Sequence, residues 1–246
     1  MGLLRQIINL IFPALCKQCG AVISADTLTT YFCNRCWDSI KWFDSSGCPQ
    51  CGLPYLSMDA SLQSSHNFGG HLCGDCHKNP PYFDKAISAG PYEGVLAEAI
   101  KLFKYKKKVH AGRALVEYSP LLQRGDRGDF IIPVPLHPKR LREREFNQSA
   151  IIASELGKRL EIPVLLDILI RFRHTRPQVE LDVKERGKNV VGAFTVQNGE
   201  VIADKDILLV DDVYTTGSTV NECAMTLKKN NARKVYVVTI ARMVIS

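Results

Sequence analysis

Residues 207–219 read Ile-Leu-Leu-Val-Asp-Asp-Val-Tyr-Thr-Thr-Gly-Ser-Thr, and this stretch is the most informative part of the chain. The four apolar residues at 207–210 predict a buried strand, and a helix is expected to begin at about Ser218. The loop between them is rich in Thr and Gly. Such a loop attracts a phosphate group, because the first turn of a helix has unpaired N–H groups and the positive end of the helix dipole.

Two adjacent carboxylates, Asp211 and Asp212, follow the predicted strand. They are expected at the carboxyl edge of the sheet, where open α/β folds bind their ligands. Side-by-side carboxylates repel one another unless a ligand shares their acceptor oxygens, and a vicinal diol does this well. A diol and a phosphate about a sugar's width apart describe ribose 5-phosphate. The alternative is an ordinary strand–turn–helix with an Asp- and Thr-rich cap.

The segment resembles the binding motif of type I phosphoribosyltransferases, which hold 5-phosphoribosyl 1-diphosphate (PRPP). Gly217 permits close backbone approach, and the hydroxyl groups of the loop add donors. A Walker phosphate loop is excluded because no Gly-Lys-Ser/Thr follows. The resemblance implies that PRPP, with Mg²⁺, binds to Asp211, Asp212, Thr215, Thr216, Gly217, Ser218 and Thr219.

Outward from this motif, strands and helices alternate. Strands are predicted at 85–89, 130–134, 207–210 and 234–241, an extended segment at 164–172, and helices at 94–105, 111–122, 147–160 and 218–230. This order predicts an α/β fold with a mostly parallel sheet, similar to type I phosphoribosyltransferases. Asn79-Pro80-Pro81 is a plausible boundary. We therefore expect a small domain at 1–80 and a phosphoribosyltransferase-like domain at 81–246.

Eight of the nine cysteines lie in four C-x-x-C pairs, and the ninth, Cys223, is expected to be a small core residue. Two thiolates three residues apart can occupy two tetrahedral corners of one Zn²⁺, and a second pair completes the site. Disulfides are disfavoured because no secretory signal is visible, and four thioredoxin-like pairs in a row would be unusual. The spacing predicts two structural zinc ions in a double zinc ribbon, one bound by Cys16, Cys19, Cys33 and Cys36, and the other by Cys48, Cys51, Cys73 and Cys76.

The spacing leaves some alternatives open at these sites. An interleaved arrangement, in which the first pair joins the third, satisfies the same spacing. His66, His71 or His77 could also replace a cysteine ligand. Residues 16–77 have little apolar periodicity, so we expect this segment to need metal in order to fold.

Three basic segments accompany these motifs in a chain of 246 residues with a formal charge of +7. The first is a loop with Lys139, Arg140, Arg142 and Arg144, and the second is a polar loop at 171–194 that could close over a ligand. The third is a run of five lysines, Lys101, Lys104, Lys106, Lys107 and Lys108, which could contact the phosphate backbone of single-stranded DNA. Each run could instead be a solvated face. The arginines proposed for the diphosphate of PRPP are Arg140, Arg144, Arg176 and Arg186.

The order of all these features resembles the ComF family, whose members are associated with DNA uptake in natural competence. The family's motifs appear as Arg142-Glu143-Arg144-Glu145-Phe146-Asn147-Gln148, Thr175-Arg176-Pro177-Gln178, Arg186, Asn189, Ala193-Phe194 and the segment 211–219. Glu145 stands where the family usually has Gly, and a carboxylate there would repel a diphosphate that approached the backbone. The second half also resembles amidophosphoribosyltransferase, but no glutaminase half is present.

The resemblance implies a cytoplasmic competence protein that binds PRPP and single-stranded DNA. It implies partners among the competence proteins, such as a DNA-uptake helicase, and through them peripheral attachment to the membrane. Two alternatives remain: an active phosphoribosyltransferase of unknown acceptor, with no catalytic residue assigned, and a PRPP-sensing adaptor that does not bind DNA. No transmembrane segment is expected, since the apolar residues between Leu3 and Ile11 mark a helix too short to span a bilayer.

Overall fold

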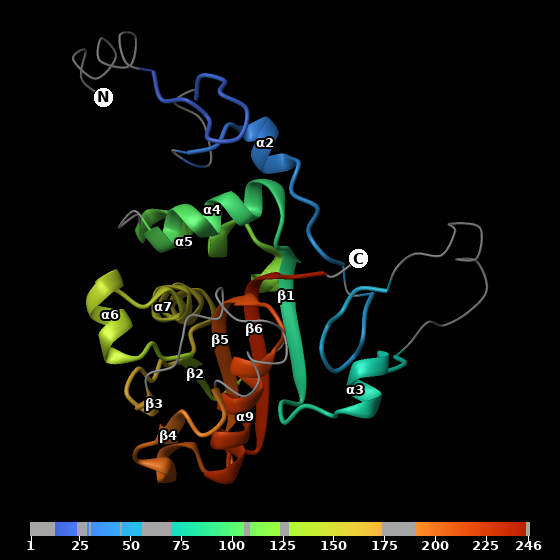
Figure 1. Ribbon diagram of the computed structural model, residues 1–246, viewed down its shortest axis with the longest axis vertical. Coiled ribbons are helices and arrows are strands. Elements are labelled where there is room, and N and C mark those ends of the chain that lie inside the picture. The colour runs from blue at the N-terminus through green and yellow to red at the C-terminus, as the bar shows by residue number, and fades with distance from the viewer. Residues whose placement is uncertain are drawn as a thin grey trace.

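The computed structural model describes residues 13–23, 29, 31–44, 46–55, 70–105, 109–123, 128–173 and 190–244. Its centre is a parallel sheet with the strand order β1-β6-β5-β2 (Figure 1). The expected α/β fold with a parallel sheet is confirmed. The four strands are β1 (Lys85–Pro91), β2 (Phe130–Pro133), β5 (Asp206–Tyr214) and β6 (Lys234–Arg242).

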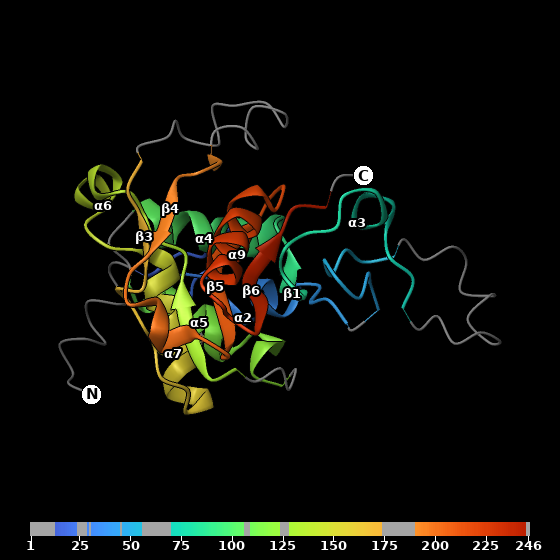
Figure 2. The same ribbon diagram turned by 90° about the horizontal axis from the view of Figure 1, so that it is seen from below.

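Both faces of the sheet are covered, as the continuous apolar runs of its strands require. One face carries α4 (Gly94–Tyr105), α5 (Val109–Glu117) and α7 (Gln148–Leu160). The other carries α9 (Ser218–Lys229) and a hairpin of β3 (Leu169–Arg171) with β4 (Phe194–Val196). Figure 2 shows α7 and α9 on opposite sides of β5. Alternate residues of β5 therefore enter different cores: Leu208 and Val210 face α7, and Ile207 and Leu209 face α9.

The two groups of cysteines pack on opposite faces of the sheet. Cys16 and Cys36 belong to the core that also contains residues of α4 and α5, and the ring of Trp37 in this core lies 6.3 Å from that of Tyr118. Cys48, Cys51 and Cys76 belong to the core that contains Phe83 and Tyr214. Two short helices, α2 (Asn34–Asp38) and α3 (Gly74–Lys78), each contain a cysteine of these groups. Figure 1 shows α2 above α4, and α3 beside β1.

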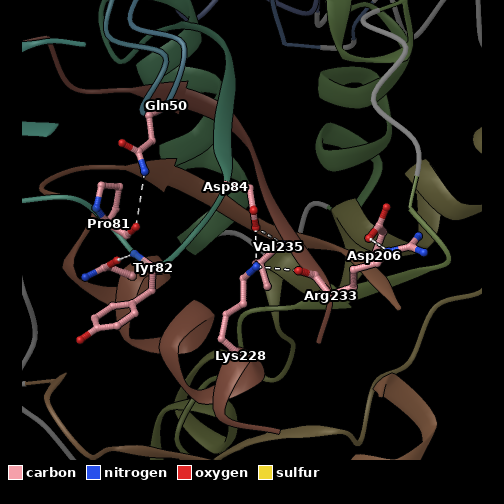
Figure 3. A network of polar contacts seen from close by, with 9 residues as sticks. Gln50, Pro81, Tyr82, Asp84, Asp206, Lys228, Arg233 and Val235 are labelled. Carbon is pink, nitrogen blue, oxygen red and sulfur yellow. Dashed lines mark hydrogen bonds and ion pairs between the residues drawn. The ribbon is translucent and has the colours of Figure 1, made fainter. Parts of the chain in front are cut away.

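Polar contacts hold the segment 79–84 against the end of the sheet where β6 begins (Figure 3). Asp84 accepts a hydrogen bond from the backbone N–H of Val235 at 2.8 Å and forms an ion pair with Lys228, also at 2.8 Å. The backbone N–H of Tyr82 donates to Asn221 at 2.7 Å. The chain that enters β1 is therefore held against α9 and β6. The domain boundary expected near Asn79-Pro80-Pro81 stays a prediction.

Local differences from the expected elements have simple causes. The helix at 94–105 is confirmed, whereas the next helix ends at Glu117 and is followed by a 3-10 turn, η2 (Pro120–Gln123). The expected basic loop contains a helix, α6 (Pro138–Arg144), which Pro138 starts and the His137 side chain caps. A second 3-10 turn, η4 (Gly199–Ile202), precedes β5. In the described parts of the chain, no helix combines the length and apolar character needed to cross a membrane.

Several expectations fall outside the described residues. They are the N-terminal apolar helix, His66, the lysines at 106–108, and Arg176 and Arg186 in the polar loop.

Candidate functional site

Asp211 and Asp212 lie near the carboxyl end of β5, and neighbouring elements bring partners to both. The strand continues to Tyr214, beyond the predicted end at Val210. Asp211 Oδ1 accepts hydrogen bonds from Ser149 Oγ at 2.8 Å and from the backbone N–H of Asp212 at 2.9 Å. Asp212 Oδ2 lies 2.7 Å from Lys104 Nζ, in an ion pair with the last turn of α4. Asp211 thus has a hydroxyl donor in Ser149, and Asp212 has an ammonium partner in Lys104.

Burial and neighbouring charges shift the pKa values of Asp211 and Lys104 in this cluster. Burial raises the pKa of Asp211 to about 7, and the neighbouring carboxylate of Asp212 adds to the increase. Burial lowers the pKa of Lys104, but attraction to Asp212 and Asp211 outweighs this effect and leaves the pKa above its ordinary value. Lys104 therefore stays charged, and Asp211 is poised to gain or lose a proton near neutral pH.

Residues 215–219, called the phosphate loop below, connect β5 to α9. Gly217 is the N-cap of α9 in the left-handed region, with φ 78°, and no side chain caps the helix. Thr216 Oγ1 and Ser218 Oγ lie 2.9 Å apart. A Cβ atom at Gly217 would lie 2.2 Å from the hydroxyl of Tyr214, so only glycine fits here. The open first turn of this helix offers N–H groups and a positive dipole end to an anion.

A pocket of about 340 Å³ joins the carboxylates to the phosphate loop and to four basic side chains. Arg140 and Arg144, one helical turn apart on α6, both line it. Arg144 also donates from Nη1 to Gln148 Oε1 at 3.3 Å. The polar residues of the lining are Tyr92, Lys104, Arg140, Arg144, Gln148, Ser149, Arg171, Asp211, Asp212, Thr215 and Thr219. Of the predicted PRPP-binding residues, Asp211, Asp212, Thr215 and Thr219 line this cavity, whereas Thr216, Gly217 and Ser218 line a neighbouring cavity of about 450 Å³.

Three contributors to this pocket were missed as site residues by the sequence reasoning. Lys104 was grouped with the lysines of a DNA-binding track, but its ion pair with Asp212 places it in the pocket. Arg171 ends β3 and is 7% exposed, with its guanidinium 5.4 Å from the centre of the Phe194 ring. Ser149 lies in the first turn of α7, behind the Asn147 cap that also donates to the carbonyl of Val134. The Asn147 cap, which follows a strand, was the one local sequence feature that pointed to a site residue near Ser149.

The remaining basic candidates lie elsewhere. Arg142 and Lys139 are exposed on α6. Arg173 is exposed, and its guanidinium donates to the backbone carbonyl of Val191. Arg176 and Arg186 lie outside the described residues.

Glu145 has a conformational role that the sequence reasoning did not foresee. It ends α6 in the left-handed region, with φ 67°, and its side chain is exposed. Its N–H donates to the carbonyl of Leu141 at 2.7 Å. This is the position at which helices most often end with glycine, because glycine adopts positive φ without strain. The positive φ at this C-cap is thus a sufficient reason for the glycine that the ComF family usually has at position 145.

The eight paired cysteines form two compact groups. Cys16, Cys19, Cys33 and Cys36 make the first cluster, and Cys48, Cys51, Cys73 and Cys76 make the second cluster. Within each, the sulfur atoms lie within 4.8 Å of one another. Four sulfurs at this spacing suit one tetrahedral Zn²⁺, so both clusters are consistent with structural zinc sites. The sequential pairing is found and the interleaved one is not. Cys223 is fully buried, as expected.

Comparisons with known proteins match two parts of the chain to known domains. A double zinc ribbon domain matches residues 7–77, and a phosphoribosyl transferase domain matches residues 147–243. Competence protein F of Haemophilus influenzae is 32% identical, over 85% of this chain and 90% of that protein. The DNA utilization protein YhgH of Escherichia coli K12 is 30% identical, over 94% of this chain and 97% of that protein.

Solved structures include a glutamine PRPP amidotransferase from B. subtilis, at 20% identity and a TM-score of 0.34. The similarity covers 52% of this chain and 24% of the amidotransferase chain, so this chain spans about a quarter of its length.

Proposed function

The chain belongs to the ComF family of competence proteins, and from this premise we propose that it binds PRPP with Mg²⁺ in the pocket at the end of β5. One observation carries the proposal. A single cavity is lined by two carboxylates for a diol, by Thr215 and Thr219 at the two ends of the phosphate loop, and by four cationic side chains for a diphosphate. These groups are complementary to the three chemical parts of PRPP, which are a ribose diol, a 5-phosphate and a diphosphate.

Each part of PRPP has a proposed partner. The ribose hydroxyls donate to Asp211 and Asp212, which have acceptor oxygens in the cavity. The 5-phosphate accepts from the N–H groups and hydroxyls of the phosphate loop. The diphosphate meets the guanidinium groups of Arg140 and Arg144, with Arg176 and Arg186 of the polar loop as further candidates. Lys104 keeps a positive charge beside the ribose.

The donor set of the pocket also fits Mg²⁺, which prefers oxygen ligands and is commonly held by one or two carboxylates together with substrate phosphates. The Asp211 and Asp212 carboxylates are the protein groups that would face it. When bound, Mg²⁺ neutralises diphosphate charge. In the two cysteine clusters we propose one structural Zn²⁺ each, so that metal analysis would give about two zinc ions per chain.

We also propose binding of single-stranded DNA, on a different surface. The specific support is that two relatives matched over most of their length are named for competence and for DNA utilization. The candidate contacts are Lys106, Lys107 and Lys108, which follow α4 in the sequence. Such a protein would act in the cytoplasm, where other competence proteins, such as a DNA-uptake helicase, could hold it at the membrane.

Catalytic turnover of PRPP and a purely sensing role are the alternatives to a DNA-handling protein. Incubation of the purified protein with PRPP and a panel of acceptors tests turnover, and release of diphosphate would favour a transferase. Salt-dependent binding of single-stranded DNA separates a DNA-handling protein from an adaptor.

Titration calorimetry of PRPP, with and without Mg²⁺, tests the central proposal. Asp212→Asn should weaken binding by roughly one to two orders of magnitude, because a charge-assisted hydrogen bond contributes about 1.5–3 kcal/mol. Asp206→Asn is the matched control: Asp206 starts the same strand, at the opposite edge of the sheet, in an ion pair with Arg233. PRPP binding should be unchanged in the control. Equal affinities of the wild type and Asp212→Asn would refute the site.

A further inference from the structure

Arg242, the last residue of β6, connects the second cluster to the strand that carries the phosphate loop. It is 7% exposed. Its Nη1 donates to the backbone carbonyl of Cys51 at 2.6 Å, and its Nη2 lies 3.7 Å from Cys51 Sγ. On its other side, the guanidinium carbon lies 4.2 Å from the centre of the Tyr214 ring. Burial of a charged group is costly unless it is well paired, so this arginine depends on both neighbours.

Tyr214 carries this contact onward to the phosphate loop. It pairs with Arg242 in the sheet register, and its carbonyl accepts from the N–H of Met243 at 2.9 Å. Its ring and hydroxyl pack against Gly217, where a Cβ atom would lie 2.2 Å from the hydroxyl and 2.5 Å from the ring. The position of the Tyr214 ring therefore limits where Gly217, the N-cap of α9, can lie.

The rest of the space between the second cluster and the phosphate loop is open. A cavity of about 450 Å³ lies there, with Cys51, Cys73 and Cys76 on one side and Thr216, Gly217 and Ser218 on the other. Arg242 and Tyr214 also line this cavity, and their contacts connect its two sides. The first cluster has no such connection among the described residues, since it packs in the core on the opposite face of the sheet.

We propose that Arg242 is a positioning residue that braces the phosphate loop against the second cluster, so that zinc in this cluster and PRPP in the pocket strengthen each other's binding. The inference rests on the proposed function, because it concerns the same phosphate loop. Four thiolates around one Zn²⁺ carry a formal charge of about −2, which the guanidinium beside Cys51 partly balances. Bound zinc thereby holds the Arg242 side chain in position beside Cys51. Arg242 in turn holds the Tyr214 ring, and the ring limits the position of Gly217 at the start of α9.

The brace couples the binding of zinc to the binding of PRPP, and this coupling is reciprocal. If zinc in the second cluster raises the affinity for PRPP by some factor, PRPP must raise the affinity for that zinc by the same factor. Since the first cluster lies outside this path, PRPP should strengthen the binding of only one of the two zinc ions.

Three variants of the full chain test the brace. Arg242→Met removes the charge and the donors while keeping much of the apolar volume. Arg242→Lys keeps a charge but not the forked donors, and should lie between Arg242→Met and the wild type. Arg233→Met is the matched control, because Arg233 precedes the other end of β6, is exposed, and pairs with Asp206. Circular dichroism establishes folding for each variant, and Arg242→Lys decides the question if Arg242→Met does not fold.

Two readouts do not require PRPP. Hydrogen exchange of the phosphate-loop amides should be roughly tenfold faster in Arg242→Met, because the loop opens more readily. Competition with a chromophoric chelator should show about 10–100-fold weaker binding of one of the two zinc ions, as for other groups that orient metal ligands. Arg233→Met should match the wild type in both. Wild-type exchange and zinc affinity in the Arg242 variants would overturn the brace.

Calorimetry with PRPP then separates the two proposals. We expect roughly tenfold weaker PRPP binding in Arg242→Met, within the usual range of coupling between sites. Saturating PRPP should tighten one zinc site in the wild type and neither site in Arg242→Met. If the wild type does not bind PRPP, the proposed function fails, and exchange and zinc affinity alone decide whether the brace exists. If PRPP binds equally to all variants, the coupling is refuted while the proposed function stands.

Discussion

Lys104 Nζ lies 2.7 Å from Asp212 Oδ2, and both side chains are mostly buried, at 19% and 14% exposed. The pair joins the last turn of α4 to the carboxyl end of β5, two elements that are distant in sequence but adjacent at the pocket. A buried pair of this kind is costly to break, because the remaining charge keeps its burial without its partner. Lys104 therefore belongs to the carboxylate cluster rather than to an exposed basic surface.

Replacement of Lys104 tests this assignment. We expect Lys104→Gln to weaken PRPP binding by roughly one order of magnitude, because the pocket loses a cation while two carboxylates stay in place. Lys101→Gln is the control, since Lys101 is exposed and pairs with Glu98 at 2.7 Å. Calorimetry of both variants with PRPP and Mg²⁺ makes the comparison. Equal affinities would show that Lys104 has no part in the site.

The raised pKa of Asp211 predicts how binding depends on pH. Its folded pKa is about 7, above the ordinary value of 3.8, so this carboxyl contributes stability at low pH that is lost as the pH rises through about 7. The ribose hydroxyls need the ionised form as an acceptor. PRPP affinity should therefore fall by up to about tenfold per pH unit below pH 7 and level off above it.

Asp211→Asn isolates this effect from the titration of the ligand. The phosphates of PRPP also gain protons below neutral pH, but they do so equally for both proteins. The ratio of wild-type to Asp211→Asn affinity should thus rise with pH and reach a plateau above about 7. A ratio that stays constant between pH 5.5 and 8.5 would contradict the assigned titration.

The phosphate loop and the cysteine clusters were predictable because short sequence patterns identify the residues that form them. Gly217 follows a strand and starts a helix, and the C-x-x-C pairs carry their own ligand geometry. The phosphate loop spans residues 215–219 and each C-x-x-C pair spans four residues, so these signals can be recognised without knowledge of the tertiary structure. The parallel sheet followed in the same way from the alternation of strands and helices.

Lys104 and Arg171 could not be found in this way. Lys104 lies in the last turn of α4 and Arg171 ends β3, and only the packing of these elements brings both residues to Asp211 and Asp212. Helix α6 was missed because its residues are mostly charged and none is buried, which leaves no apolar periodicity to detect. The hairpin of β3 and β4 has strands of only three residues, too short for an alternation to stand out.

The left-handed C-cap of α6 predicts a stabilising substitution. Glu145→Gly should raise the free energy of unfolding by about 1 kcal/mol, because glycine adopts φ 67° without the steric cost borne by other residues. Glu161→Gly is a matched comparison, since Glu161 ends α7 with φ 58°. Chemical denaturation should show similar gains for both, with PRPP affinity unchanged. A large gain in PRPP affinity for Glu145→Gly alone would show that this carboxylate repels the diphosphate.

The lysine run after α4 predicts a surface for single-stranded DNA that is separate from the PRPP pocket. Lys104 faces Asp212 and Lys101 pairs with Glu98, which leaves Lys106, Lys107 and Lys108 as the proposed contacts. Their replacement by Gln should weaken binding of every DNA sequence alike, because phosphate contacts carry no base information. The slope of log affinity against log salt should flatten by about 0.7 for each lost phosphate contact.

PRPP binding is the internal control for this triple variant. It should stay at the wild-type level, because Lys104 and the carboxylates of the pocket are intact. A wild-type salt slope would exclude the run as the DNA surface and leave the zinc ribbons as the better candidate. Loss of PRPP binding would instead assign these lysines to the diphosphate, since a cation that leaves the DNA slope unchanged but weakens PRPP must act at the pocket. The two measurements together therefore decide which phosphate these side chains meet.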